Sequence, residues 1–172
     1  MKPKMKIGAR FRRVFAISFL SLVLHAPSFA QTLGVSVPAA THGWAGGLNF
    51  HAEKTKSRLE SQYPELKIIL VTASNASEQA NDLEDLLTIH QIDALVILPF
   101  ESAALTGPVR NVKRSGVFVT VVDRGLTDPS IRDFYVAGNN NQMGRVSANY
   151  IKGRLDENGK IVILRGMPTV ID

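Results

Sequence analysis

Apolar runs of strand length recur along this chain and alternate with amphipathic stretches. The first four runs occupy residues 32–37, 66–72, 94–98 and 117–122, at roughly thirty-residue spacing. Between them, apolar residues recur three or four positions apart, which is the period of a helix with one buried face. Strands that alternate with helices in this rhythm predict a parallel sheet with crossover helices.

Local signals set the expected helix ends. The first helix is expected from Trp44 to the Tyr63-Pro64 pair, because proline cannot continue the helical hydrogen-bond ladder. Later helices are expected over residues 77–90, 102–115 and 141–154, and two more strands over 134–137 and 159–164. We therefore expect an α/β fold with a doubly wound parallel sheet, whose near-continuous apolar strands need cover on both faces.

The first 30 residues have the composition of an export signal. Six Lys and Arg residues flank the start of an apolar core over 14–24, and Ser28-Phe29-Ala30 fits a small-x-small cleavage site. A membrane anchor, the alternative, needs a longer apolar core. Arg12-Arg13 weakly indicates twin-arginine export, but the flanking residues favour the general secretory route. We expect a signal peptide over residues 1–30 and a periplasmic mature protein.

This leader also explains the basic charge of the whole chain. Of the 20 Lys and Arg residues, six lie in the first 30 positions, whereas all 15 acidic residues lie beyond them. The formal charge of +5 therefore becomes −1 without the leader. This balance gives no support for nucleic-acid binding.

Two classes of chemistry have no basis in this composition. The chain has no cysteine, which excludes thiol catalysis, thiolate metal sites and disulfide bonds. Its four histidines are scattered, and none has a second metal ligand at a useful spacing. We expect neither a metal nor another cofactor.

Asp123 and Arg124 are the strongest candidates for binding a ligand. They follow directly after the fourth apolar run, and ligand sites of parallel sheets lie beyond the carboxyl ends of the strands. A carboxylate accepts hydrogen bonds and a guanidinium donates them, so the pair suits a polar small molecule such as a sugar. The alternative is an exposed ion pair with no function.

Several stretches of the chain together resemble a known family, the periplasmic sugar-binding proteins of ABC importers. This is the ribose-binding type, which shares its fold with the effector domains of LacI-type repressors. The stretches that carry the likeness are residues 35–38 with Trp44, Gln79 with 83–87 and 92–99, 121–124, and 136–140 with Gly144 and 159–166. Their order and spacing cover essentially all of residues 32–172.

In that family two doubly wound lobes close on a monosaccharide across a hinge. The resemblance implies an incomplete first lobe over residues 31–135, and a hinge crossover with the start of a second lobe over 136–172. Relatives continue well beyond this length, so we expect a truncated form. Asn139 and Asn140 are expected at the hinge, and Asn140 is expected to cap the helix that follows.

The loop after the first strand supplies further candidates. Trp44 matches the position of a ring-stacking aromatic in the family, although it could instead fill the core. His42 lies where relatives have a polar residue, and the alternative for it is a solvated surface histidine. Thr41 is a weaker candidate. Phe100 either lines the pocket or packs under the third helix.

One departure from the family concerns the ligand. Many relatives place a polar residue before the proline that follows the third strand, but Leu98 precedes Pro99 here. The resemblance therefore argues against ribose itself and leaves a deoxy-sugar, a polyol or a differently held pentose or hexose.

We expect a monomeric, non-enzymatic solute-binding protein that delivers a monosaccharide or polyol to an ABC permease. Delivery to a chemoreceptor or sensor kinase is a variant with the same sequence signals. The effector domain of a LacI-type regulator is an alternative, but it needs a DNA-binding motif where the export signal stands. An exported α/β hydrolase-like enzyme is another, but neither a serine elbow nor paired carboxylates are found.

Overall fold

The computed structural model describes residues 31–40, 43–156, 158–164 and 166. The expected leader and two candidate site residues, Thr41 and His42, lie outside this range. Among the described helices, none is both long and apolar enough to cross a membrane.

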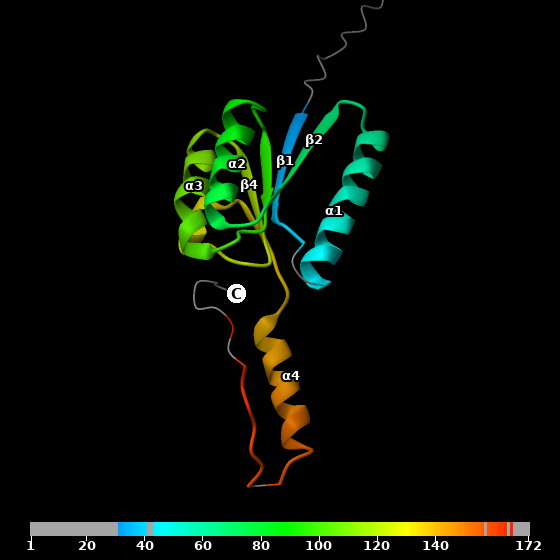
Figure 1. Cartoon of the computed structure of the whole chain (residues 1–172), viewed down its shortest axis with the longest axis vertical. Helices are drawn as coiled ribbons and strands as arrows, with labels where there is room; N and C mark the ends of the chain where they lie inside the picture. Colours follow the sequence, from blue (N-terminus) through cyan, green and yellow to red (C-terminus); the bar gives the residue numbers. More distant parts are fainter. Residues whose placement is uncertain (1–30, 41–42, 157, 165, 167–172) are drawn as a thin grey trace, which may run out of the picture.

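The expected parallel sheet is confirmed. It has five strands in the order β2-β1-β3-β4-β5, and every neighbouring pair is parallel. The pair β2–β1 lies at one side of the sheet, and β3, β4 and β5 follow beyond β1 in the order of the sequence. Figure 1 shows the arrangement. The strands are β1 (Gln31–Pro38), β2 (Leu66–Ala73), β3 (Ala94–Ile97), β4 (Phe118–Val122) and β5 (Phe134–Val136).

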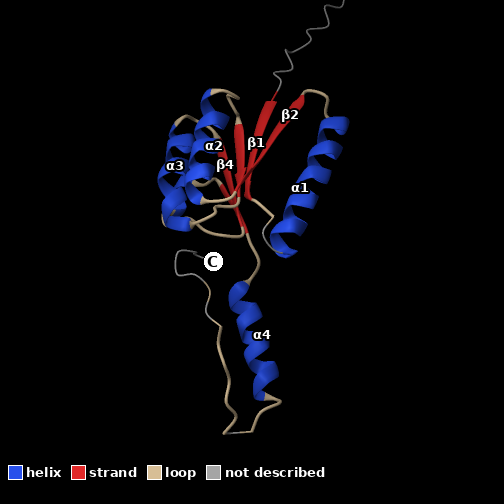
Figure 2. Ribbon diagram, viewed as in Figure 1, coloured by secondary structure: helices blue, strands red, loops and turns tan. Residues whose placement is uncertain are grey.

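The helices divide between the two faces of this sheet. Helices α2 and α3 pack side by side on one face, whereas α1 lies on the other face next to β2 (Figure 2). All of the expected helices are present, with ends within a few residues of those predicted. Their bounds are α1 (Gly43–Gln62), α2 (Ala76–Thr88), α3 (Ser102–Arg114) and α4 (Asn140–Lys152), with a short 3-10 turn at Pro129–Ile131.

The hydrophobic core lies between the sheet and helices α2 and α3. Alternate residues of the central strands point into it and are fully buried, as the period of a strand requires. These are Leu95, Ile97, Val119 and Val121. On the opposite face, Phe134 and Val136 of β5 are 60% and 50% exposed. Among the described elements only α1 covers that face, so the expected cover on both sides of the sheet is incomplete within the described residues.

Capping residues explain where two of the elements begin or end. The Asn75 side chain accepts a hydrogen bond from the Glu78 N–H at 2.8 Å, which satisfies a free donor in the first turn of α2. The Glu78 carboxylate reaches back and accepts bonds from the Ser74 hydroxyl and N–H, which lower the pKa of Glu78. After α3, Gly116 adopts the expected left-handed conformation, with a φ of 87°.

Helix α4 extends away from the sheet, and all of its residues are exposed (Figure 1). The expectation that Asn140 caps this helix is wrong. Asn140 is the first helical residue, and the Asn139 side chain accepts the Gln142 N–H at 2.9 Å instead. The helix starts one residue earlier than the sequence pattern indicated, which moves the cap to the preceding asparagine.

The expected sixth strand is also wrong. Residues 159–164 have no regular structure, and Val162 and Leu164 are 89% and 93% exposed. A strand needs a neighbour to bond to its backbone, and in the described part of the chain this apolar segment lies beside no other strand (Figure 1).

Gly34 provides a test of how tightly β1 packs on α2. A Cβ atom at Gly34 would stand 2.9 and 3.2 Å from atoms of Ile92 and 3.3 Å from Leu86. Gly34→Ala should therefore lower the free energy of unfolding by about 1–2 kcal/mol, because overpacking forces core side chains to move.

Urea denaturation measures this change, and Gly47→Ala is the matched control. Gly47 lies in α1, and an added Cβ there meets nothing within 4 Å. The control should raise stability by about 0.5–1 kcal/mol, as alanine does in place of a helical glycine. Equal stability of Gly34→Ala and the parent chain would contradict the packing described here.

Candidate functional site

The five parallel strands end at one side of the sheet, here called the carboxyl edge. It is formed by the last strand residues and the loops that follow them. Because Ile97 of β3 pairs with Val121 of β4, the loop after Ile97 lies next to the loop after Val122. Asp123 and Arg124 therefore stand beside residues 98–100, although the two segments are more than twenty residues apart in the sequence.

Arg124 is tied to the loop after β3. Its Nη1 donates to the Phe100 carbonyl at 2.9 Å and makes a longer contact, 3.4 Å, with the Pro99 carbonyl. A guanidinium has five N–H donors in a rigid fork. Its Nε and Nη2 have no hydrogen-bond partner among the described residues, so this half-buried side chain is fixed in place while most of its donors stay available.

Asp123 is held through its backbone and leaves its side chain unused. The residue has a φ of 62°, in the left-handed region that few non-glycine residues adopt. Its N–H donates to the Val136 carbonyl at 2.8 Å, and its carbonyl accepts the Tyr135 hydroxyl at 2.7 Å. The half-buried carboxylate has no hydrogen-bond or ion-pair partner within the described ranges.

The ion pair that the sequence left open as an alternative is not formed. Asp123 and Arg124 are neighbours in the chain, but no salt bridge joins them in the part of the chain that the structure describes. The carboxylate remains an acceptor and the guanidinium remains a donor. Such a neighbouring pair can bond two adjacent hydroxyl groups of one ligand.

The loop after Arg124 is anchored by Asp128. Bonds from the Ser130 hydroxyl and N–H, and then one from Arg110 at 3.1 Å, lower the pKa of Asp128. Because the folded-state pKa is depressed, the carboxylate keeps these bonds at neutral pH. The stability that they contribute is lost as the pH falls through that lowered value.

Trp44 is the second residue of α1, just beyond the carboxyl end of β1. Its side chain is 62% exposed, so it does not fill the core. The exposed ring leaves a flat apolar surface in the first turn of α1, and stacking on a sugar stays a prediction. Thr41 and His42 precede it in the sequence, lie outside the described residues and remain predictions.

Phe100 enters the site through its backbone. Its ring is partly buried and packs against the hydrophobic core, whereas its carbonyl oxygen holds Arg124. Whether the ring also touches a ligand stays a prediction.

The two hinge candidates lie at the exit of β5. Asn139 and Asn140 are exposed and, together with Tyr135 and Gly138, line a hollow of about 320 Å³. The structure brings them to the same edge as Asp123, through the strand pair β4–β5.

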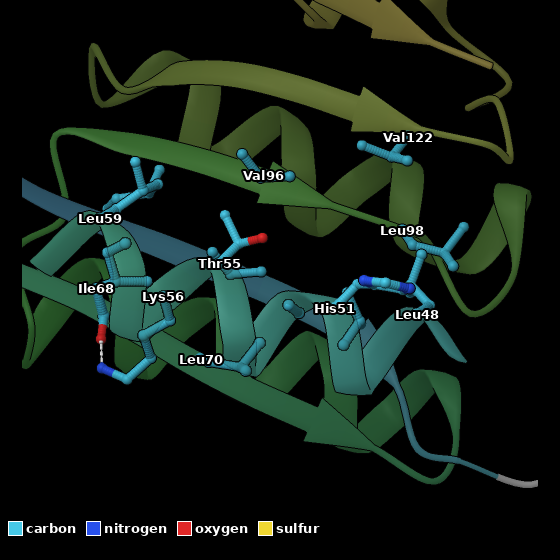
Figure 3. Close-up of a pocket in the computed structure, with 14 residues that line it drawn as sticks. Leu48, His51, Thr55, Lys56, Leu59, Ile68, Leu70, Val96, Leu98 and Val122 are labelled. Carbon is cyan, nitrogen blue, oxygen red and sulfur yellow. Dashed lines mark hydrogen bonds between the residues drawn. The ribbon is translucent and has the colours of Figure 1, made fainter. Parts of the chain in front are cut away.

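A second cavity, of about 360 Å³, lies between α1 and the sheet (Figure 3). Its walls are mainly Leu, Ile and Val side chains, and the Lys56 ammonium is already bonded to Glu60 and to the Ile68 carbonyl. This cavity has few polar groups to orient a polar ligand. No three His, Asp or Glu residues gather to hold a metal ion within the described residues.

Sequence reasoning missed Tyr135 and the loop carbonyls. Tyr135 was predicted only as part of a strand, and the partner of its hydroxyl follows from the pairing of β4 with β5. No residue type marks a backbone carbonyl as the partner of an arginine, so the Phe100 contact had no sequence signal.

Two curated relatives resemble this chain along much of its length. The ribose import binding protein RbsB of Bacillus subtilis is 31% identical over 138 residues, which are 80% of this chain and 43% of that protein. The D-xylose-binding periplasmic protein of Escherichia coli is 28% identical over 102 residues, 58% of this chain and 30% of that protein. The chain thus spans less than half the length of either relative.

Solved structures agree on the fold. A solute-binding protein of an ABC transporter from Actinobacillus succinogenes, with bound D-allose, superposes with a TM-score of 0.66 at 18% identity. The match covers 81% of this chain and 50% of that one. A periplasmic ribose ABC transporter protein from Conexibacter woesei gives 0.62 at 20% identity, over 77% and 43% of the two chains.

The sequence profile of the periplasmic binding protein domain family matches residues 33–172, which include every described element except the first residues of β1. This match, the curated relatives and the shared sheet order lead to one conclusion. The chain belongs to the periplasmic binding protein domain family.

Proposed function

We propose that this chain carries the first sugar-recognising lobe of an exported solute-binding protein that serves an ABC importer. The observation that carries the proposal is the Asp123 carboxylate, which has no partner among the described residues, next to the anchored Arg124 guanidinium. Both stand at the carboxyl edge, where parallel sheets bind ligands. The protein binds a monosaccharide or polyol without turning it over.

The chemistry of a sugar fits this arrangement. Each hydroxyl both donates and accepts, so one hydroxyl donates to Asp123 while its neighbour accepts from Arg124. The exposed Trp44 ring packs on the C–H bonds of the sugar face. His42, Thr41 and Phe100 are further candidates for contact.

The choice of sugar differs from that of the ribose-binding type. Leu98 is only 3% exposed and lines the apolar cavity under α1, so its side chain offers no polar group to a ligand. Relatives are named for ribose and D-xylose, and solved structures of this fold contain D-allose or myo-inositol. We propose a pentose, hexose or polyol other than ribose.

Binding is completed by lobe closure. Residues 31–135 form the first lobe, Asn139 and Asn140 the hinge, and α4 with the following segment the start of the second lobe. Residues 1–30 direct export to the periplasm, where a membrane permease receives the liganded protein. A sensory partner is the second candidate, because the fold also occurs in the fructose-binding periplasmic domain of a hybrid two-component system.

The central test is a titration of the chain that is monitored by amide NMR. The ligands are D-ribose, D-xylose, D-fructose, D-glucose, D-allose and myo-inositol. One lobe alone should bind the right sugar with a Kd on the order of 1 mM, about −4 kcal/mol. Asp123→Asn should weaken binding at least tenfold, because it removes the charged acceptor. Asparagine tolerates the left-handed backbone of position 123, so the loop is preserved.

Asp85→Asn is the matched control. Asp85 is exposed on α2 and its carboxylate has no partner among the described residues, so the same substitution there should leave the Kd unchanged. The proposal would be contradicted if none of the six sugars changed the amide NMR signals of the residues at the carboxyl edge.

Trp44 gives an independent optical readout, because it is the only tryptophan in the sequence. Its fluorescence should change in intensity or wavelength as the right sugar stacks on the exposed ring. Trp44→Ala should weaken binding by about 0.5–1.5 kcal/mol, the range of specific aromatic contacts. If NMR detected sugar binding while the Trp44 fluorescence did not change, the ring would have no part in binding.

Tyr135→Phe tests whether the backbone of Asp123 must be held. It removes only the hydroxyl that donates to the Asp123 carbonyl, and should lower the free energy of unfolding by about 1 kcal/mol and weaken sugar binding. Tyr150→Phe on the exposed helix α4 is the control and should change neither quantity. The hypothesis fails if both variants behave alike in urea denaturation and sugar titration.

A further inference from the structure

Gln79 is a fully buried polar residue on α2, and no role has yet been assigned to it. Its Nε2 donates to the Ser36 hydroxyl at 3.1 Å and to the Leu98 carbonyl at 2.9 Å. Its Oε1 accepts the Phe100 N–H at 2.6 Å. One side-chain amide therefore connects α2, β1 and the loop after β3, and both of its donors and its acceptor are in use.

The bonds to Leu98 and Phe100 fix the peptide between Pro99 and Phe100. A peptide unit is planar, and in the trans form its N–H and C=O point in opposite directions. No cis peptide occurs in the described residues. The Phe100 N–H points to Gln79, so the Pro99 carbonyl of the same plane must point away from it.

Arg124 lies on that opposite side. Its Nη1 contacts the Pro99 carbonyl at 3.4 Å and bonds to the Phe100 carbonyl at 2.9 Å. The Phe100 backbone thus stands between two side chains: Gln79 holds its N–H and Arg124 holds its C=O. If the Phe100 N–H moves, the Pro99 and Phe100 carbonyls that bond to the guanidinium move with it.

Volume alone does not explain a glutamine at this position. A leucine of similar size would fill the space, whereas burying an amide costs free energy unless each polar atom is bonded. Every donor of this amide is bonded to a group that sits at the carboxyl ends of β1 and β3. The residue is therefore suited to specifying one conformation of this loop.

We propose that Gln79 is a positioning residue that sets the place of Arg124, and through it the affinity for the sugar. This inference rests on the proposed function for its consequence, but its geometric part concerns the unliganded chain. Gln79 itself touches no ligand. It acts through the Phe100 backbone.

The test compares the chain with its Gln79→Leu and Gln79→Glu variants by NMR, first without sugar. In Gln79→Leu the Phe100 amide should lose its protection from hydrogen exchange, and the Arg124 side-chain N–H signals should shift. In Gln79→Glu, burial keeps the introduced carboxyl neutral, so its carbonyl oxygen still accepts the Phe100 N–H and both signals should stay close to those of the parent.

Sugar titrations then measure the consequence, with D-xylose, D-allose and myo-inositol as probes. Gln79→Leu should raise the Kd about tenfold, equivalent to about 1.4 kcal/mol, and Gln79→Glu should restore most of the affinity. Val112→Ala is the control for lost stability. Val112 is buried near the far end of α3, so this variant should be destabilised without any shift of the Arg124 signals.

The parent chain offers a test that needs no substitution. This test decides whether Gln79 holds the loop if the Gln79→Leu variant does not fold. Slow exchange of the Gln79 side-chain amide protons and of the Phe100 N–H is expected. Fast exchange of both, or unchanged Phe100 and Arg124 signals in Gln79→Leu, overturns the inference. If the parent chain binds none of the sugars, the proposed function is contradicted instead. The hydrogen-exchange and NMR-signal tests of Gln79 remain valid in that case.

Discussion

The parallel pairing of β3 with β4 is the constraint on which the site depends. It places the loop after Ile97 beside the loop after Val122, and so brings the Phe100 carbonyl within 2.9 Å of the Arg124 guanidinium. Without this register Arg124 would be a solvated side chain with many rotamers. With it, the guanidinium is held by the backbone of the loop after β3, and the entropic cost of ordering this side chain is met on folding.

Each half of the candidate pair is positioned by a different neighbour. The loop after β3 holds Arg124, whereas β5 holds Asp123 through the Val136 carbonyl and the Tyr135 hydroxyl. Asp123 keeps its left-handed backbone because the Val136 carbonyl and the Tyr135 hydroxyl both bond to it. Backbone strain of this kind clusters at functional sites. The site is therefore a property of three adjacent strands, with β4 in the centre.

The two faces of the sheet differ in how fully they are covered. Helices α2 and α3 cover one face, and the core residues of β3 and β4 are fully buried there. On the other face α1 is the only helix in the described part of the chain, and Phe134 and Val136 of β5 remain exposed. Parallel sheets are normally covered on both faces, so the exposed apolar residues of β5 depart from that pattern within the described residues.

The sequence by itself determined the elements and their type. Apolar runs of strand length and the 3.6-residue period between them predicted five strands and four helices correctly, because burial of strands and of one helix face leaves those patterns in the local sequence. It also singled out Asp123 and Arg124, since the ends of strands can be located from apolar runs, and the family resemblance singled out Trp44. It failed at residues 159–164, where an apolar run of strand composition has no neighbouring strand.

Only the tertiary structure decided which groups meet. The contacts of Arg124 with Phe100, of Tyr135 with Asp123 and of Gln79 with the loop after β3 join residues 12 to 24 positions apart, and all three use backbone carbonyls as acceptors. Every residue has such a carbonyl, so nothing in the amino-acid types marks the ones that matter. Strand order and register select them, and these follow from the packing of the whole sheet.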